Sequence, residues 1–146
     1  MILLDTNVIS EFMTPSPDVR VTRWLDSQPR SSIWTTSVNL FEIRAGLWNM
    51  PTGKRRTALE THFEQLLQIA IQGRILYFDT DSALSAAQLS ADRRKRGCPM
   101  DVRDTMIAGI VLANHAMLAT RNVKHFEDIA KWVVNPWDET GTKEKK

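Results

Sequence analysis

Hydrophobic residues in this chain form short continuous runs separated by longer stretches with helical spacing. The first run, Ile2–Leu4, is too short for a helix and long enough for a buried strand. Similar runs at residues 32–35, 75–78 and Met117–Ala119 predict three more strands, and Val133–Val134 is a marginal fifth. The pattern therefore predicts a chain in which short strands alternate with helices.

The stretches between these runs place apolar residues three and four positions apart, as amphipathic helices do. Their limits are set by capping residues, prolines and glycines. The clearest predicted helix runs from Thr52 to Gln72, and Gly73 is its natural stop. The other expected helices start at or just after Thr6 or Asn7, Asp18, Ser37, Asp81, Asp101 or Val102, and Asn122.

Short apolar strands separated by helices indicate βαβ units, which build a parallel sheet with right-handed crossovers. We therefore predict a three-layer α/β/α domain. The length of 146 residues suits one such domain. We expect it to span residues 1–139 and to be followed by a disordered tail at residues 140–146.

Composition narrows the class of protein without giving its function. The chain is 42% hydrophobic and 25% charged, as ordinary globular proteins are. Its formal net charge of +2 equals that of residues 143–146 alone, so overall charge says nothing about nucleic acid. Cys98 is the single cysteine, and neither a signal region nor a run of about twenty apolar residues is present. We therefore expect a cytoplasmic protein without an internal disulfide or a membrane span.

Four polar residues are expected at one edge of the sheet. Asp5 directly follows the first strand, Glu42 lies in the second turn of the helix after the second strand, and Asn122 follows the fourth strand. Because parallel strands point the same way, these residues gather at the edge where open α/β sheets bind ligands. Asp104 reaches the same edge by way of a loop. On position alone, Asp5 could equally be only a helix cap.

Three carboxylates in one cleft repel one another, so they need either raised pKa values or a cation among them. Oxygen ligands without a Cys or His partner in the pattern favour Mg²⁺ or Mn²⁺. Mg²⁺ usually takes only one or two protein carboxylates directly and keeps several waters. The pattern therefore predicts a metal site at which activated water can attack phosphorus.

These residues lie in four ordered motifs that resemble a known family. The motifs are Leu-Leu-Asp5-Thr-Asn, Phe-Glu42-Ile-Arg, Asp104-Thr-Met-Ile-Ala-Gly and Thr120-Arg-Asn122-Val-Lys-His-Phe. With the ending Val134-Asn135-Pro136-Trp137, they make almost the whole chain similar to the PIN-domain nucleases. The closer resemblance is to the VapC-type toxins of bacterial toxin–antitoxin pairs and to FitB-like proteins.

The resemblance implies a five-stranded parallel sheet, Mg²⁺- or Mn²⁺-dependent endoribonuclease activity on single-stranded RNA, and a homodimer. It also implies a cognate antitoxin whose DNA-binding domain is the only link to operator DNA. By position, Asp5 and Asp104 match the direct metal ligands, Glu42 matches the third acidic residue, and Thr120 matches a supporting hydroxyl. Asn122 replaces a carboxylate that many relatives carry, and its side-chain oxygen can hold a metal-bound water.

Basic residues beside the acidic positions are candidates for contact with RNA phosphates. Arg44, Arg121 and Lys124 are the residues concerned, and Thr120 joins them on the substrate side. The basic run at residues 93–96 ends a helix, where cations are favourable and usually solvated. For that run we prefer a structural interpretation.

Two alternatives come from other functional classes. A haloacid-dehalogenase-like phosphatase also begins with an apolar strand that ends in Asp, but it usually has a second Asp two residues later. This chain has Asn7 there. A catalytically weak PIN-fold module could act mainly through its antitoxin and DNA. Asp5, Glu42 and Asp104 are all present, which favours the nuclease.

Overall fold

The computed structural model describes residues 1–98 and 100–138 and contains one sheet of five parallel strands. The strand order is β3-β2-β1-β4-β5, and every pair of neighbours is parallel. The predicted sheet is thus confirmed, whereas the predicted tail at residues 140–146 lies outside the described residues. The strands are β1 (Ile2–Leu4), β2 (Ile33–Thr36), β3 (Ile75–Leu76), β4 (Met117–Ala119) and β5 (Val133–Val134).

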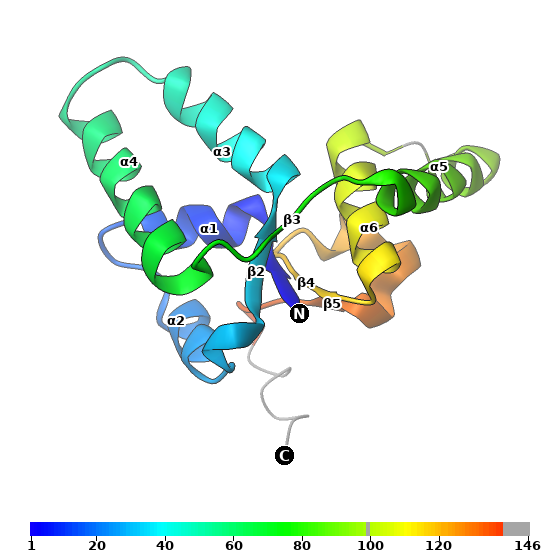
Figure 1. The fold of residues 1–146 in the computed structure, drawn as a ribbon, viewed down its shortest axis with the longest axis horizontal. Coiled ribbons are helices and arrows are strands. Elements are labelled where there is room, and N and C mark those ends of the chain that lie inside the picture. Colours follow the sequence, from blue (N-terminus) through cyan, green and yellow to red (C-terminus); the bar gives the residue numbers. More distant parts are fainter. Residues whose placement is uncertain (99, 139–146) are drawn as a thin grey trace.

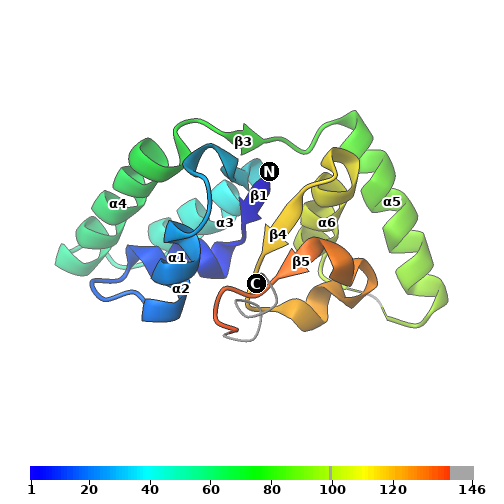
Figure 2. The same cartoon turned by 90° about the horizontal axis from the view of Figure 1, so that it is seen from below.

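Helices cover both faces of the sheet and give the predicted three layers (Figures 1 and 2). None of the helices in the described part of the chain is long and apolar enough to cross a membrane. One face carries α1 (Thr6–Met13), α2 (Val19–Asp26), α3 (Ser37–Trp48) and α4 (Lys54–Leu66). The other carries α5 (Thr80–Lys95), α6 (Val102–Asn114) and the 3-10 segment η3 (Val123–Trp132).

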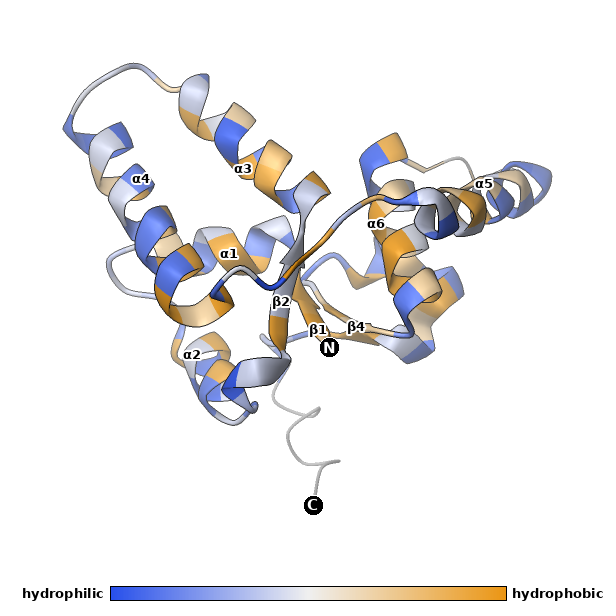
Figure 3. Ribbon diagram, viewed as in Figure 1, coloured by the Kyte–Doolittle hydropathy of each residue, from blue (hydrophilic) through white to orange (hydrophobic). Residues whose placement is uncertain are grey.

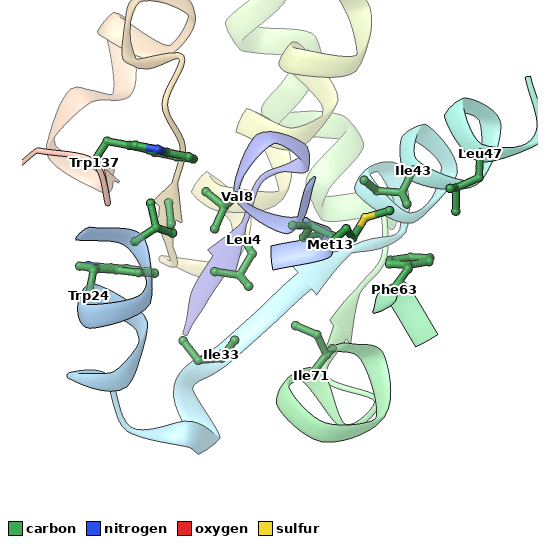
Figure 4. Close-up of a cluster of buried hydrophobic side chains, with 13 residues drawn as sticks. Leu4, Val8, Met13, Trp24, Ile33, Ile43, Leu47, Phe63, Ile71 and Trp137 are labelled. Carbon is green, nitrogen blue, oxygen red and sulfur yellow. The ribbon is translucent and has the colours of Figure 1, made fainter. Parts of the chain in front are cut away.

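The central strand β1 is apolar throughout because both of its faces are covered. Leu3 packs in the cluster under α5 and α6, and Leu4 packs in the opposite cluster under α1 to α4. Figure 4 shows this second cluster, in which Trp24 and Phe63 pack around the strand. Successive side chains alternate between the faces, so a strand buried on both sides has no polar position.

The winding of the chain changes direction between β1 and β4. From β1 the chain moves outward through β2 to β3, and it then returns to the other side of β1 as β4. The segments that leave β1 and β4 therefore go to opposite faces of the sheet, as Figure 2 shows. In open α/β sheets, such a switch point is where ligands bind.

Two predicted helix caps are wrong by one or two residues. Thr36, instead of Ser37, caps α3, and its hydroxyl accepts the backbone N–H of Asn39 at 3.1 Å. Asp79, instead of Asp81, caps α5 and accepts the backbone N–H of Ser82 at 2.9 Å. In both places two good capping residues stand close together in the sequence, so residue preference alone could not choose between them.

The predicted helix over residues 52–72 forms in two parts. The α-helix starts at Lys54 and ends at Leu66, and Leu67–Ile71 then forms a π-helical turn. Gln72 ends this turn in the left-handed region with φ of 51°, and the predicted stop Gly73 follows with φ of 76°. The predicted C-terminal end of this helical segment is therefore confirmed, but the change from α-helix to π-helix was not predicted.

Two predicted elements of the second half differ in extent or type. The third strand was expected over residues 75–78, but only Ile75–Leu76 pairs with β2, and Tyr77 is exposed. The predicted helix from Asn122 is a 3-10 segment with non-helical dihedral angles at Phe126 and Ile129. Both of these side chains are buried, so packing against the sheet overrides regular helix geometry here.

The contact between α5 and α6 depends on Gly109. A Cβ atom at this position would lie 2.5 Å from the carbonyl oxygen of Ser82 and 2.6 Å from the Cβ of Ala86. We predict that Gly109→Ala lowers the free energy of unfolding by about 1–3 kcal/mol, because backbone atoms must move apart. Chemical denaturation checks this, with Gly46→Ala as the control. A Cβ at Gly46 would meet no atom of the described residues within 4 Å apart from its chain neighbours and the backbone of its own helix, so an equal loss in both variants would contradict the prediction.

Candidate active site

The candidate site lies at the carboxyl ends of β1 and β4, where the winding changes direction. Asp5 directly follows β1, and its backbone N–H donates to the carbonyl of Ala119 at 3.0 Å. Thr120 directly follows β4, and its hydroxyl donates to Asp5 Oδ2 at 2.7 Å. The two strand ends therefore meet on one carboxylate, at the edge of the sheet where the sequence pattern placed Asp5.

The Asp5 carboxylate is almost fully buried and is held by four donors. Oδ1 accepts the backbone N–H of Thr6 at 2.8 Å and the amide of Asn39 at 2.9 Å. Oδ2 accepts the Thr120 hydroxyl and, at 3.4 Å, the amide of Asn7. Asp5 is therefore both the cap of α1 and a carboxylate in a fixed orientation, so the two interpretations of this residue are compatible.

Asn39 is an important residue that the sequence pattern did not reveal. It is fully buried, and its amide donates to both Asp5 and the hydroxyl of Thr6, the latter at 3.0 Å. The Thr36 hydroxyl fixes the amide by donating to its oxygen at 2.6 Å. The only available signal was an amide three residues after a threonine cap, which is common at helix starts for other reasons.

Glu42 lies in the second turn of α3, as predicted, and faces the same group of residues. Its Oε1 accepts the Thr6 hydroxyl at 2.9 Å, and its Oε2 is 3.6 Å from the guanidinium of Arg103. Burial raises the pKa of Glu42, and the negative charges of Asp5 and Asp104 add to this rise. The carboxylates of three separate elements therefore influence one another.

Asp104 lies in the first turn of α6 and is partly buried. Burial raises its pKa, and the charge of Asp5 adds to the rise. Asp101 instead caps the helix, where it accepts the backbone N–H of Arg103 at 2.8 Å, and this bond lowers the pKa of Asp101. The structure thus confirms that Asp101 caps α6, and it places Asp104 one turn further along the same helix, where Asp5 and Glu42 influence it.

Two side chains beside the acids, an arginine and a histidine, were not part of the predicted pattern. Arg103 pairs with Glu42, and the Nδ1 atom of His125 lies 3.1 Å from Asp104 Oδ2. The expectation of a constellation without a histidine partner is therefore wrong for Asp104. The error has a simple cause: 21 residues separate the two side chains, and only the packing of η3 beside α6 brings them together.

The remaining predicted residues fall into different surroundings. Thr120 is fully buried, so its hydroxyl supports Asp5 and is not open to a substrate. Asn122 is exposed, and its backbone N–H donates to the Thr120 hydroxyl at 3.1 Å. Lys124 is also exposed, and it lines a cavity next to His125.

Arg44 and Arg121 point to other partners. The Arg44 guanidinium pairs with Glu64 and lies 4.8 Å from the centre of the Phe63 ring, so it connects α3 to α4 instead of contacting the acids. The Arg121 guanidinium lies 4.9 Å from the centre of the Trp137 ring, while its backbone N–H donates to the side chain of Asn7 at 3.0 Å. Of the basic candidates, Arg121 is the nearest in sequence to the end of the site strand β4, with only Thr120 between them.

The donor set fits a hard divalent cation. Asp5 and Asp104 offer carboxylate oxygens, and the raised pKa of Asp104 reflects burial and negative charge that a cation would offset. Within residues 1–98 and 100–138, no three His, Cys, Asp or Glu side chains lie close enough to enclose an ion by themselves. Mg²⁺ does not need such a cage, because it keeps several waters and binds one or two carboxylates.

Comparisons with known proteins show the family to which this chain belongs. Residues 2–131 match the family model of the PIN domain. The chain is 38% identical to VapC ribonuclease Y4jK of Sinorhizobium fredii, over 94% of this chain and 99% of the relative. It is 35% identical to toxin FitB of Neisseria gonorrhoeae, over the same shares of each chain.

Solved structures give the same result for the fold. A structure of FitAB bound to the IR36 DNA fragment superimposes with a TM-score of 0.84, at 35% identity over 94% of this chain and 96% of that one. The chain is thus similar to these proteins over nearly its whole length. The similar part includes the five parallel strands, the helices on both faces and the acids at the switch point. The chain therefore belongs to the PIN domain family, and its relatives include a VapC ribonuclease and the toxin FitB.

Proposed function

We propose that this protein is a metal-dependent endoribonuclease that cleaves single-stranded RNA and is the toxin of a toxin–antitoxin pair. The observation that carries the proposal is the group of three carboxylates at the switch point, two of them with raised pKa values. Acids gathered in this way favour binding of a hard cation and proton transfer from water. The similarity to VapC ribonuclease Y4jK supports the ribonuclease activity, and the similarity to toxin FitB supports the role as a toxin.

In this proposal, Asp5 and Asp104 hold Mg²⁺ or Mn²⁺. A divalent cation bound there would lower the pKa of water and offset charge at the phosphate. Asp5 needs no reorientation because its four donors already fix both oxygens. Its rigid position fits the requirement that a ligand be held by surrounding hydrogen bonds.

Glu42 is suited to accept a proton from the attacking water. Its pKa lies above the ordinary value, which brings it nearer to neutral pH, where a general base works best. The Thr6 hydroxyl and Arg103 hold its two oxygens, so the carboxylate has a defined direction. The exposed Asn122 side chain can orient water or a phosphate oxygen at the rim of the site.

We further propose that the protein forms a homodimer in the cytoplasm and that an antitoxin with a DNA-binding domain covers the acidic site. Operator DNA would be bound only through that antitoxin. The FitAB structure with its DNA fragment supports such an assembly. A group of carboxylates also offers a natural partner for an arginine from an inhibitor, since guanidinium binds carboxylate with two hydrogen bonds.

The proposal is tested with purified protein and single-stranded RNA. We predict cleavage with Mg²⁺ or Mn²⁺ that leaves 5′-phosphate and 3′-hydroxyl ends and stops with chelator. Water is the nucleophile, so the ribose 2′-hydroxyl is not consumed. End-labelled products resolved on a gel give the measurement. Products with 2′,3′-cyclic phosphates, or cleavage that continues in chelator, would refute the mechanism.

A further inference from the structure

A cavity of about 90 Å³ lies beside the acidic site, between the end of α5 and the segment η3. His125 forms part of its wall and also contacts Asp104 at 3.1 Å. The His125 side chain therefore connects the cavity to the carboxylate of Asp104. Nothing in the mechanism proposed above uses the other residues that line it.

The floor of the cavity is a buried ion pair between Arg93 and Asp128. The guanidinium donates to both carboxylate oxygens, at 2.6 and 2.9 Å, and the Arg93 side chain is only 3% exposed. It also donates to the Thr105 hydroxyl at 3.0 Å and to the carbonyl of His125 at 3.4 Å. Arg93 thus fixes η3 against α5 and α6 through contacts that do not depend on a substrate.

The walls of the cavity carry more positive than negative charge. Arg96 lies 3.2 Å from the same carboxylate that Arg93 already neutralises, so Asp128 balances only one of the two guanidiniums. The hydrogen bond from Arg93 also lowers the pKa of Asp128, which keeps it ionised. Lys124 adds a further cation, and Glu127 is the remaining acid of the lining. A net positive charge therefore remains on the accessible walls.

Arg96 has the exposure and geometry needed to bind a phosphate. Its side chain is 55% exposed although one edge is held by Asp128. A guanidinium that is already fixed on one edge loses little conformational freedom when its other edge binds two phosphate oxygens. The ammonium group of Lys124 would add a point charge to the same phosphate. Figure 3 shows that the ribbon of α5 is strongly hydrophilic at this end.

We propose that Arg96 and Lys124 form a subsite for one backbone phosphate of single-stranded RNA, next to the phosphate cut at the acidic site. This inference rests on the proposed function. It divides the basic run at the end of α5 into three parts. Arg93 is structural, Arg96 contacts RNA, and the exposed Arg94 and Lys95, which do not line the cavity, only favour the helix end.

The test compares two double variants of equal charge. Arg96→Ala with Lys124→Ala removes the subsite, and Arg94→Ala with Lys95→Ala removes the same charge from the adjacent positions. Binding of a labelled, mixed-sequence single-stranded RNA is measured in chelator at several salt concentrations. The slope of log K against log salt changes by about 0.7 for each phosphate contact in single strands. We expect the slope of the first variant to be shallower than that of the wild type by about 0.7, which corresponds to one phosphate contact. The second variant should keep the wild-type slope.

Equal slopes for the two double variants would overturn the subsite, and so would a wild-type protein that binds no RNA. Thermal midpoints within about 2 °C of the wild type show that folding is not the cause. In cleavage assays with Mg²⁺, the first variant should raise KM and leave kcat nearly unchanged, because the contact is the same in the ground and transition states. RNA binding without cleavage by the wild type would refute the nuclease proposal while the slope test still decides on the subsite.

Discussion

Replacing Asp104 by asparagine is expected to reduce RNA cleavage by more than about 100-fold while leaving the fold intact. The substitution keeps the shape of the side chain but removes one of the two charged oxygen ligands proposed for the metal. Even residues that only support a ligand typically cost 10- to 100-fold when changed, so loss of a ligand should exceed that range. Cleavage rates at saturating Mn²⁺ give the measurement, and expression of this variant should not arrest growth, in contrast to the wild type.

The same variant should be more stable than the wild type when metal is absent. The pKa of Asp104 is raised, so its ionised form is less favourable in the folded than in the unfolded chain. The folded state therefore binds more protons, and this group makes the free energy of unfolding fall as pH rises above its unfolded pKa of 3.8. The stability advantage of Asp104→Asn should be present at pH 7 and disappear toward pH 4, as measured by denaturation in chelator.

Asp101→Asn is the matched control for this variant. Asp101 is three residues away on the same helix, but it serves as the cap, and asparagine is an equally good cap. We expect most of the cleavage activity to remain and the free energy of unfolding to fall by less than about 1 kcal/mol. An inactive Asp101→Asn together with an active Asp104→Asn would reverse the assignment of the two acids.

Replacing Arg93 by methionine is expected to lower the free energy of unfolding by about 3 kcal/mol. Its guanidinium is buried and donates to Asp128, Thr105 and the carbonyl of His125, so its removal leaves buried acceptors without this partner. Breaking a buried ion pair by removing one member costs about 3–5 kcal/mol, and the loss here should lie at the low end of that range because Arg96 remains 3.2 Å from Asp128. Urea denaturation at pH 7 gives the measurement.

The control for this prediction is Arg56→Met, which removes the same side chain from a pair on the surface of α4. Arg56 lies 3.4 Å from Glu60, and both side chains are more exposed than those of the Arg93 pair. Surface pairs of this kind contribute about 0–1 kcal/mol. If both variants lose the same small amount, then the Arg93 pair is not the anchor of η3 that its burial indicates.

The sequence alone was sufficient for the features that depend on neighbouring residues. An apolar run ended by Asp5 specifies a buried strand followed by a capped helix, and the structure has both. Local spacing also indicated that Asp101 could cap the next helix, and the structure confirms this cap, whereas the choice of Asp104 as the metal ligand came from the resemblance of the residues that follow it. Repetition of such units was enough to predict the parallel sheet and the edge at which the acids meet.

Other features required the tertiary structure because they join residues that are distant in the sequence. Asn39 reaches Asp5 across 34 positions, and Arg93 reaches Asp128 across 35. The sequence pattern placed Arg93 in a solvated basic run, and only the packing of η3 against α5 and α6 shows that it is buried. Local preferences fix which residues can cap, bend or span the core. The position of each distant partner is decided when helices pack on the two faces of the sheet, because a buried polar group without a hydrogen-bond partner is costly.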